Sequence, residues 1–532
     1  MISAQRPGRG LRQGLIALAG MGALYATMAT PAAQARGSAH PLAAGPARGG
    51  SITIAVAGTP DCLDPQKTAL AASNAVFAYL VDPLFSADEH GNIRPYLATG
   101  YTYNASGTEV TVSLRHGVRF SNGDPFDASA VKYTYDRAVN PATKSPLSGS
   151  SLASVKETRV VDPYTVRLVL KQPYRPLLLL ALSNTYLGIL DPKAKTTCTS
   201  VIGTGPYKIQ SVGPGYTTVT TVRNSYHTYE PAWAHNAGAP YLDKVVFRSI
   251  VSDATTVSEL LSGGVDIAGV TGPQVNRVQG NANVVQHRTP QDGEFYLGFN
   301  LAHSPFNGLA VRRAVAQAID RKAIVQGVFN GLGQPADSPI PSTLPFYDKA
   351  APTYAPQYDV AAAQKALAGT PVAHGRYTLL VPAIPQYTTA AELIQAELAQ
   401  VGVNLNVSTK PLGAFIPQAA KGQYDMLILG WSYPDPDLLY QLFHSSQAAA
   451  GGLNFTNYKS ATLDSLLVKG RTATDQGQAA AVYAQLQRFI DTNVIIDPLA
   501  TAVTIVGTHA RVKGYHTDNT GAFLISDLYV AS

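Results

Sequence analysis

The sequence predicts an α/β protein whose sheet contains parallel strands. Residues 377–381, 403–407 and 426–429 are apolar runs typical of strands, and the intervening residues 389–400 and 411–421 have helical patterns. This alternation favours a parallel sheet, because parallel strands need long crossover connections. Hydrophobic residues make up 45% of the chain and charged residues 14%, which indicates a folded protein rather than a disordered one.

The first 35 residues have the order of a secretory signal peptide. An arginine-bearing start is followed by an apolar run over residues 15–29 and by the small-residue pattern Ala33-Gln34-Ala35, so cleavage after Ala35 is expected. A retained membrane anchor is the alternative, although two glycines and a threonine make the run weakly apolar. Residues 36–50 are rich in Ala, Gly and Pro and are expected to form a flexible linker. We therefore expect an extracytoplasmic protein, in the periplasm or at the cell surface, without a lipid-bearing cysteine.

The length and charge of the chain indicate how many domains to expect and whether it binds nucleic acid. A chain of 532 residues is expected to form roughly two to four domains. The formal net charge is +6, but three of those charges are Arg6, Arg9 and Arg12 in the segment expected to be removed. No other cluster of lysine and arginine suggests a nucleic-acid surface, so no nucleic-acid partner is expected.

Cys62 and Cys198 are the only cysteines. An even pair in a chain directed to an oxidising compartment favours one long-range disulfide. Two free, buried thiols remain the alternative.

In chain order, the first half of the mature chain alternates strands, turns and helices. Residues 51–57, 109–114 and 165–170 have strand patterns, and Asp127 is placed to cap a helix over residues 128–139. Residues 244–250, 254–261 and 265–270 then predict a strand–helix–strand unit. In the second half, residues 295–300 form a strand pattern, and Asp320 is placed to cap a following helix.

The stretch of residues 424–443 holds the best candidate site. Residues 426–429 predict a buried strand that we expect Gly430 and Trp431 to end. Ligands of open α/β sheets bind beyond the carboxyl ends of strands. The candidate site residues are accordingly Trp431, Ser432, Tyr433, Asp435 and Asp437, with Asn300 at the end of another strand. The alternative is a proline-stiffened surface loop over a core tryptophan.

Catalytic and cofactor motifs are missing from the sequence. There is no HExxH, GxSxG, GxxxxGK[ST] or CxxC pattern, and the histidines are scattered. Residues 331–336 (GLGQPA) fit GxGxxA, but Pro335 and the lack of a preceding strand indicate a turn. Asp435 and Asp437 lack further carboxylates nearby in sequence, so neither a metal site nor acid–base catalysis is expected there. We therefore expect no catalytic residues, no metal and no cofactor.

The ordered set of segments resembles the extracytoplasmic solute-binding proteins of ABC importers, family 5, the peptide, opine and nickel class. The segments that carry the resemblance span nearly the whole mature chain: residues 62–65 (CLDP), 93–101 (IRPYLATGY), 114–138, 203–207 (GTGPY), 260–268 (LLSGGVDIA), 295–321, 424–431 (YDMLILGW), 435–437 (DPD) and 514–515 (GY).

The resemblance implies a two-lobed periplasmic-binding-protein-like fold of class II, with three domains and a ligand cleft between the lobes. It implies that domain I combines residues 51–84, 204–299 and 501–532, that domain II is inserted as residues 85–203, and that domain III comprises residues 300–500. Hinge closure around a ligand is expected of such a fold. The Cys62–Cys198 bridge would then lie between segments that the fold brings together.

The resemblance also implies a ligand position. In peptide-binding relatives an extended ligand pairs with main-chain groups just after the strand, a role that falls here to Gly430, Trp431 and Ser432. An acidic residue three positions beyond the tryptophan holds the ligand's amino group, but that position is Pro434 in this chain. The nearest acids, Asp435 and Asp437, are the candidate substitutes.

The function implied is that of a monomeric binding protein that captures a small-molecule or peptide ligand and delivers it to the transmembrane subunits of an ABC permease. A non-peptide solute such as a sugar, opine, metal chelate or natural product is the first alternative. An enzyme or sensory protein on the same fold is the second. Histidine, aspartate and serine side chains converging in the cleft would favour the enzyme.

Overall fold

The computed structural model describes residues 46–448 and 452–531, so the predicted signal peptide and most of the predicted linker lie outside the described residues. Among the helices of these two ranges, none is both long and apolar enough to cross a membrane. The division into three domains stays a prediction.

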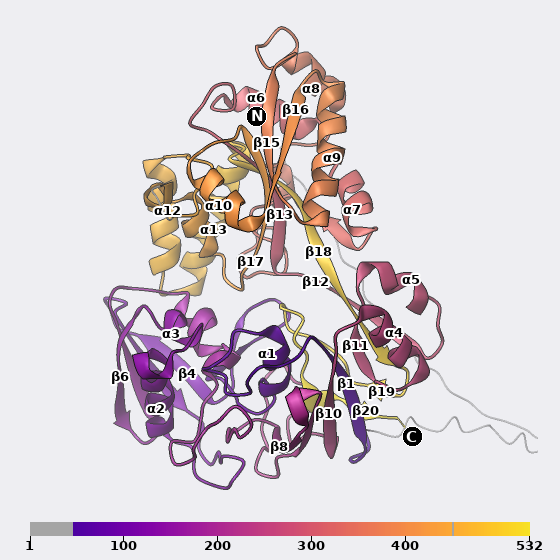
Figure 1. Ribbon diagram of the computed structural model, residues 1–532. Helices are drawn as coiled ribbons and strands as arrows, with labels where there is room; N and C mark the ends of the chain where they lie inside the picture. The colour runs from indigo at the N-terminus through magenta and orange to yellow at the C-terminus, as the bar shows by residue number, and fades with distance from the viewer. Residues whose placement is uncertain (1–45, 449–451, 532) are drawn as a thin grey trace, which may run out of the picture. The chain divides into compact units, whose positions relative to one another are not determined.

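A mixed sheet of twelve strands runs through most of the described chain (Figure 1). Its order is β16-β15-β17-β13-β18-β11-β1-β10-β9-β8, and β12 and β14 pair with β18 beside that path. The strands are β1 (Ser51–Ala57), β8 (Tyr207–Val212), β9 (Thr218–Arg223), β10 (Lys244–Ile250), β11 (Ile267–Gly269), β12 (Val284–Pro290), β13 (Gly293–Phe299), β14 (Gly333–Pro335), β15 (Arg376–Pro382), β16 (Asn404–Lys410), β17 (Met426–Ser432) and β18 (Ile496–His509).

The remaining strands form three smaller sheets. A four-stranded antiparallel sheet has the order β4-β5-β7-β6, and two-stranded sheets pair β2 with β3 and β19 with β20. These strands are β2 (Phe85–Ala87), β3 (Ile93–Pro95), β4 (Ala98–Tyr103), β5 (Glu109–Leu114), β6 (Val155–Asp162), β7 (Thr165–Leu170), β19 (Val512–Lys513) and β20 (Tyr529–Val530).

The helices lie mostly between the strands of the main sheet and after β17. They are α1 (Ala71–Phe77), α2 (Ala128–Val139), α3 (Ser148–Ser151), α4 (Asp253–Ser262), α5 (Val275–Val278), α6 (Leu309–Gln317), α7 (Arg321–Phe329), α8 (Val360–Leu367), α9 (Pro385–Gln400), α10 (Leu412–Ala420), α11 (Leu438–Phe443), α12 (Ala461–Thr472) and α13 (Gln476–Thr492). Asp127 and Asp320 cap α2 and α7 as predicted, because their carboxylates accept main-chain N–H groups of the first turn.

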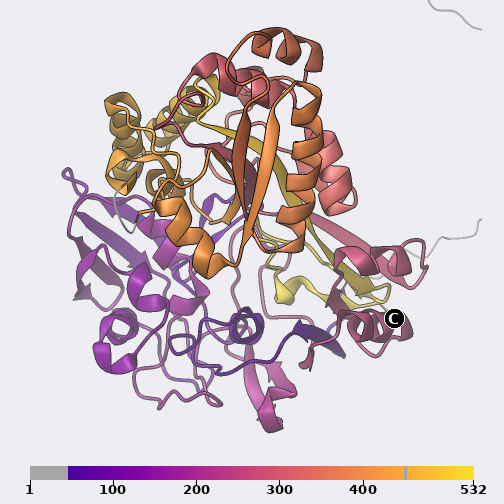
Figure 2. The same ribbon diagram turned by 45° about the horizontal axis from the view of Figure 1, so that its top comes forward.

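The predicted parallel strands are confirmed at one end of the main sheet. β15 pairs in parallel with both β16 and β17, and α9 and α10 make the crossovers. Leu379 of β15 packs with Ile394 of α9, whereas the next residue, Leu380, packs with Phe415 of α10. Both faces of β15 are therefore buried, which explains its continuous apolar sequence. Figure 2 shows α9 running beside β15 and β16.

The predicted strand–helix–strand unit of β10, α4 and β11 is also confirmed, but a further strand lies between its two strands. α4 connects β10 to β11, and β1 lies between these two strands, parallel to both. β18 joins this part of the sheet to the β13–β17 part. Its beginning pairs with β13, and its later residues pair with β11 and β12 (Figure 1). One strand of 14 residues thus links the two groups of parallel strands.

β17 is longer than the sequence pattern indicated. We expected Gly430 and Trp431 to end the strand, but it continues to Ser432 because antiparallel pairing with β13 extends that far. Ser432 lies opposite Gly293, where a Cβ atom would be 2.4 Å from the carbonyl oxygen of Trp431. The absence of a side chain at Gly293 lets the two strands approach closely at this point.

Cys62 and Cys198 form the predicted disulfide. The bond ties the loop after β1 to the segment before β8. The main-chain N–H of Leu63 also donates to the carbonyl of Cys198 at 2.9 Å, so the two segments are held by a covalent and a hydrogen bond.

Candidate functional site

Two cavities adjoin the end of β17. The strand-end cavity has a volume of about 320 Å³ and is lined by Gly430, Trp431 and Ser432 together with residues of β13, α7, α9 and β18. The aromatic cavity has a volume of about 340 Å³, and Pro434 is its one lining residue from the segment after β17. Both volumes lie in the range of small-molecule binding sites.

The main chain at the end of β17 has a free edge. On one side, every residue from Met426 to Ser432 is paired with β13. On the other side, β15 pairs only with Met426 and Leu427. The N–H and C=O groups beyond Leu427 on that side therefore meet no described strand, although the main-chain N–H of Gly430 is bonded to the hydroxyl of Tyr387. The strand-end cavity adjoins Gly430, Trp431 and Ser432. A free edge of this kind can accept an extended peptide as an additional strand.

Trp431 is partly buried at the edge of the core beside this cavity. Its cross-strand neighbour is Glu294, which is 3% exposed. Neither the indole Nε1 of Trp431 nor either carboxyl oxygen of Glu294 has a hydrogen-bond partner within the described part of the chain. Burial, with the nearby Asp491, raises the pKa of Glu294 well above its ordinary value.

Ser432 is tied to the segment before β13. Its hydroxyl donates to Oδ1 of Asp292 at 2.6 Å. Burial raises the pKa of Asp292, while the hydrogen bond from Ser432 acts in the opposite direction. Asp292 and Glu294 thus place two acidic side chains next to the end of β17 that the sequence pattern did not indicate.

Asp435 forms a buried ion pair with Arg175. The guanidinium Nη2 lies 2.6 Å from Oδ1 and Nη1 lies 3.0 Å from Oδ2, and the two side chains are 5% and 0% exposed. Arg175 also donates to the carbonyl of Gly470 and to the hydroxyl of Tyr483. Burial alone would lower the pKa of Arg175, but Asp435 outweighs it and raises that pKa.

Asp437 is paired in the same way with Arg471. Nε and Nη2 of Arg471 donate to its two carboxylate oxygens at 2.8 and 2.7 Å. Burial raises the pKa of Asp437 to about 6, although Arg471 acts in the opposite direction. Tyr433, between these residues and Trp431, is partly buried, and its pKa rises to about 12 for the same reason. Both candidate carboxylates therefore already have a guanidinium partner.

The structure does not bring Asn300 to the other candidates. β13 runs antiparallel to β17, so Asn300 lies at the opposite end of this strand pair from Trp431, roughly 20 Å away at 3.4 Å per residue. Its amide nitrogen donates to the carbonyls of Gly422 and Tyr424 at 3.0 Å each. The side chain is 1% exposed and holds the loop before β17.

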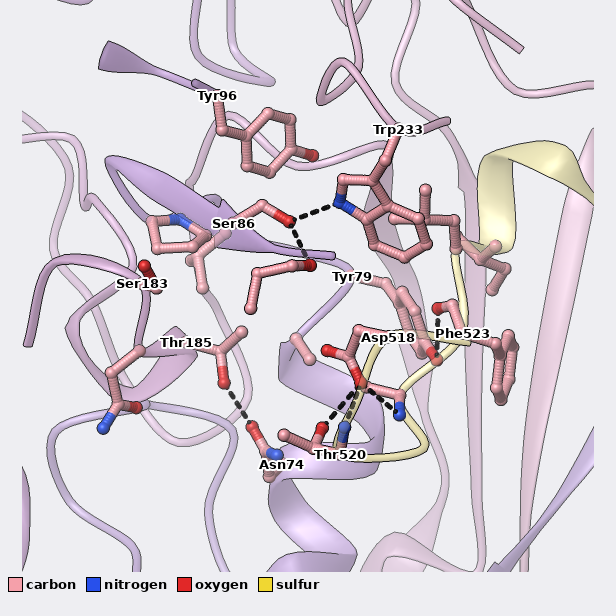
Figure 3. A pocket seen from close by; sticks show the side chains of 18 of the residues that line it. Asn74, Tyr79, Ser86, Tyr96, Ser183, Thr185, Trp233, Asp518, Thr520 and Phe523 are labelled. Carbon is pink, nitrogen blue, oxygen red and sulfur yellow. Dashed lines mark hydrogen bonds between the residues drawn. The ribbon is translucent and has the colours of Figure 1, made fainter. Parts of the chain in front are cut away.

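The aromatic cavity is built from segments far apart in the sequence. Its aromatic lining consists of Tyr79, Tyr96, Tyr186, Trp233 and Phe523. Figure 3 labels Tyr79, Tyr96, Trp233 and Phe523. Tyr79 comes from the residues after α1, Trp233 from the loop between β9 and β10, and Phe523 from the C-terminal segment before β20.

Several polar groups of this lining form side-chain hydrogen bonds. The indole Nε1 of Trp233 donates to the hydroxyl of Ser86 at 2.8 Å, and the hydroxyl of Thr185 donates to Oδ1 of Asn74 at 2.7 Å (Figure 3). The hydroxyl of Tyr96 donates to Asp82 at 2.8 Å. These bonds fix the orientation of the rings, so the cavity is preorganised.

A buried histidine lies behind the wall of the aromatic cavity. His227 bonds through Nε2 to Glu230 at 3.0 Å, and its other ring nitrogen lies 2.9 Å from the carbonyl of Thr204. Burial alone would lower the pKa of His227, but Glu230 and Asp82 outweigh it and raise the value to about 9. Glu230, which lines the cavity, therefore has a cationic partner.

One group in the described ranges has the composition of a metal site. Single ligand atoms of His235, His516 and Asp527 lie within 4.8 Å of one another. Nε2 of His516 lies 3.2 Å from Asp527, whose carboxylate also accepts the main-chain N–H of His235. The group lines neither cavity.

Sequence reasoning missed Arg175, Arg471 and the aromatic cavity. Arg175 is 260 residues from Asp435, and no local pattern pairs them. Arg471 is 34 residues from Asp437, on the last turn of α12, and also has no pattern that points to its partner. In the C-terminal region, only Gly514 and Tyr515 were indicated by the sequence, as part of the family resemblance, and no cavity residue was predicted there.

Comparison with known proteins identifies the class. Residues 92–451 match the sequence model of the bacterial extracellular solute-binding proteins, family 5 Middle. The chain belongs to this family. The glutathione-binding protein GsiB of Salmonella paratyphi A is 29% identical over 476 residues, which cover 86% of this family 5 protein and 90% of GsiB. GsiB of Escherichia coli K12 is 27% identical, covering 82% and 86% of the two chains.

Solved structures with the same fold include HbpA2 from Haemophilus parasuis, with a TM-score of 0.80 and 22% identity over 90% of this chain and 100% of HbpA2. DppA from Helicobacter pylori, in complex with the peptide STSA, has a TM-score of 0.66 and 24% identity over 91% of this chain and 99% of DppA. These likenesses confirm the predicted periplasmic-binding-protein-like fold. Family 5 proteins are the extracytoplasmic solute-binding components of ABC importers, and this is the function of the present chain.

Proposed function

We propose that this family 5 protein captures a short peptide or peptide-like solute and delivers it to the permease subunits of its importer. The observation that carries the proposal is the end of β17, where the main chain beyond Leu427 pairs with no described strand on one side and Gly430, Trp431 and Ser432 line the strand-end cavity. Main-chain pairing recognises any extended peptide, and pockets beside the strand select its side chains. The relatives named as glutathione-binding proteins and the peptide held by the Helicobacter pylori DppA support this ligand class.

In this proposal the protein binds its ligand and returns it chemically unchanged. Gly430, Trp431 and Ser432 would hold the ligand main chain, and the aromatic cavity would take an adjoining part of the ligand. The proposed unit of binding is a monomer. Asp435 and Asp437 would shape the loop through their arginine partners rather than contact the ligand.

Native mass spectrometry of protein purified from its natural host tests the proposal. We expect a peptide-sized ligand to co-purify, and titration calorimetry of the ligand-free protein to show binding of di- to tetrapeptides with no cleavage products. Binding of a sugar, an opine or a nickel chelate in place of every peptide would overturn the ligand class.

Trp431→Ala is expected to weaken ligand binding by roughly 30-fold, about 2 kcal/mol, because buried aromatic side chains dominate the energetics of binding sites. Trp431→Phe, which keeps an aromatic ring at the same place, is the matched variant and should lose less affinity. Calorimetry gives the affinity, and a thermal melt of each variant separates a binding loss from a folding loss. Unchanged affinity in Trp431→Ala would place the ligand elsewhere.

We further propose that residues 1–35 direct export and are removed. The mature protein is then expected to begin at Arg36, because Ala33-Gln34-Ala35 has the small residues that signal peptidase requires. N-terminal sequencing of the protein from its host checks this. Membrane-associated protein that still begins at Met1 would show that the segment is an anchor.

A further inference from the structure

The aromatic cavity has an acidic lining without a basic counterpart. Two of its lining residues, Glu230 and Asp518, are acidic, and no lysine, arginine or histidine is among the described residues that line it. Glu230 is bonded to the cationic His227. Asp518 has no such partner, since no described lysine, arginine or histidine lies in ion-pair contact with it. Within the described ranges, Asp518 is therefore the one acidic lining residue that has no cationic partner.

The hydrogen bonds of Asp518 are concentrated on one of its two oxygens. Oδ1 accepts the main-chain N–H and the hydroxyl of Thr520 at 2.8 and 2.7 Å, and the N–H of Ala522 at 3.0 Å. Figure 3 shows these bonds, with the second carboxylate oxygen turned toward the space between the drawn side chains. The turn of residues 518–522 thus fixes the carboxylate and leaves Oδ2 available to a ligand.

The neighbouring residue, Asn519, carries a buried amide that lies next to Gly91. Asn519 also lines the cavity and is only 2% exposed. Neither its amide nitrogen nor its amide oxygen has a hydrogen-bond partner within the described ranges. Buried polar groups without partners are costly, and a polar ligand group would relieve that cost.

We propose that the aromatic cavity receives an organic ammonium group of the ligand, with the carboxylate of Asp518 as its counter-ion. The rings of Tyr79, Tyr96 and Trp233 present their aromatic surface to the same space, and cations are attracted to the faces of such rings. The assignment deepens the proposed function, since it gives a peptide ligand an ammonium acceptor at a place other than Pro434. The ammonium is either the peptide N-terminus or a lysine side chain.

The first test uses n-butylammonium and n-butanol as probes and does not depend on the peptide proposal. The fluorescence of Trp233, one of the two tryptophans, should respond to the ammonium probe and not to the alcohol. Asp518→Asn should abolish the response, because asparagine keeps an oxygen to accept the turn hydrogen bonds but carries no charge. Equal responses to both probes, or no response to either, would overturn the proposal.

The second test compares tri-alanine, Ala-Lys-Ala and their N-acetylated forms by calorimetry. If the N-terminus is held, acetylation and Asp518→Asn should each weaken tri-alanine binding by about 30-fold or more, and should not weaken it further when combined. If a lysine side chain is held, acetylated Ala-Lys-Ala should keep its affinity and lose it only in Asp518→Asn. If the affinity for peptides is unchanged both by N-acetylation and by Asp518→Asn, the ammonium site is overturned while the proposed function stands.

Asp136→Asn is the matched control for both tests. Asp136 lies on α2, its side chain is half exposed, and it pairs only with Lys132 of the same helix. Its substitution removes the same charge from the protein without touching the cavity. A loss of ammonium binding in Asp136→Asn equal to that in Asp518→Asn would show a general charge effect and overturn the site.

The pH dependence of binding offers a further readout. Burial raises the pKa of Asp518 to about 6, although Thr520 and Ala522 act in the opposite direction. Asp292, Tyr79 and Tyr515 are the other titratable groups that face it, and Asp292 adds to the rise. Only the ionised carboxylate attracts an ammonium, so affinity should fall by up to about tenfold between pH 7 and pH 5. Asp518→Asn should lack this fall, and a fall of the same size in that variant would contradict the assignment.

Discussion

Replacing Arg175 with methionine is expected to lower the free energy of unfolding by about 3 to 5 kcal/mol, because it leaves the carboxylate of Asp435 buried without a partner. Arg175 and Asp435 are 5% and 0% exposed, so water does not screen their interaction. The same guanidinium also satisfies the carbonyl of Gly470 and lies 5.0 Å from the ring centroid of Phe346. Urea unfolding of the wild type and of Arg175→Met measures the difference in the free energy of unfolding.

The control is Arg159→Met, which breaks the pair of Arg159 with Glu157. These two side chains are 51% and 45% exposed, and pairs of this kind contribute little to stability. The double variant Arg175→Met/Asp435→Leu should recover part of the loss, because it removes both buried charges. A change in Arg175→Met no larger than that in Arg159→Met would show that water reaches Asp435.

The ion pair of Arg175 and Asp435 is also expected to affect ligand binding. Arg175 lies just before the Leu178–Leu182 turn, and its main-chain N–H donates to the carbonyl of Arg471 at 2.9 Å. Asp435 lies in the loop after β17 that carries Pro434 into the aromatic cavity. Breaking the pair should therefore weaken ligand binding as well as stability.

The second large effect concerns the disulfide. Replacing Cys62 and Cys198 together with serine is expected to lower the free energy of unfolding by roughly 3 to 5 kcal/mol. The two cysteines are 136 residues apart, and a link across a long loop removes much of the conformational entropy of the unfolded chain. Thermal and urea unfolding of the wild type and the double variant measure the difference.

Reducing agent supplies the internal control for this prediction. Dithiothreitol should destabilise the wild type toward the level of the Cys62→Ser/Cys198→Ser variant and should leave that variant unchanged. Leu63 and Tyr216 still donate to the carbonyl of Cys198 at 2.9 and 3.1 Å, so the loop can refold without the bond. Equal stability of the two proteins without reductant would contradict the entropic argument.

The strands and caps followed from local patterns. β15 and β17 are buried on both faces, so their sequences are continuously apolar and could be recognised without a structure. Asp127 and Asp320 were recognisable for a similar reason, because a cap bonds within its own first turn. The end of β17 could not be placed this way. Its pairing partner, β13, lies more than a hundred residues earlier in the chain, and that pairing overrides the local signal of Gly430.

The candidate site was predictable only in part. Trp431 and Ser432 line a cavity at the end of a strand, as the rule for α/β sheets leads one to expect. Asp435 and Asp437 were reasonable candidates from the sequence alone, since nothing nearby in the chain neutralises them. Asn300 lies apart from the other candidates because its strand runs antiparallel to β17, and the alternation of side chains in a sequence does not indicate strand direction.

The sequence by itself indicated the α/β class, the parallel strands and two helix caps, and it favoured the pairing of its only cysteines. The caps depend on residues within one element, and the parallel strands on the order of strands and helices along the chain. The tertiary structure alone decided which charges neutralise one another and which remain free. Arg175 reaches Asp435 across 260 residues, whereas Asp518 lies in a cavity wall with no cationic partner among the residues that the structure describes. Electrostatic interactions depend on distance in space and on burial, and neither quantity follows from separation along the chain.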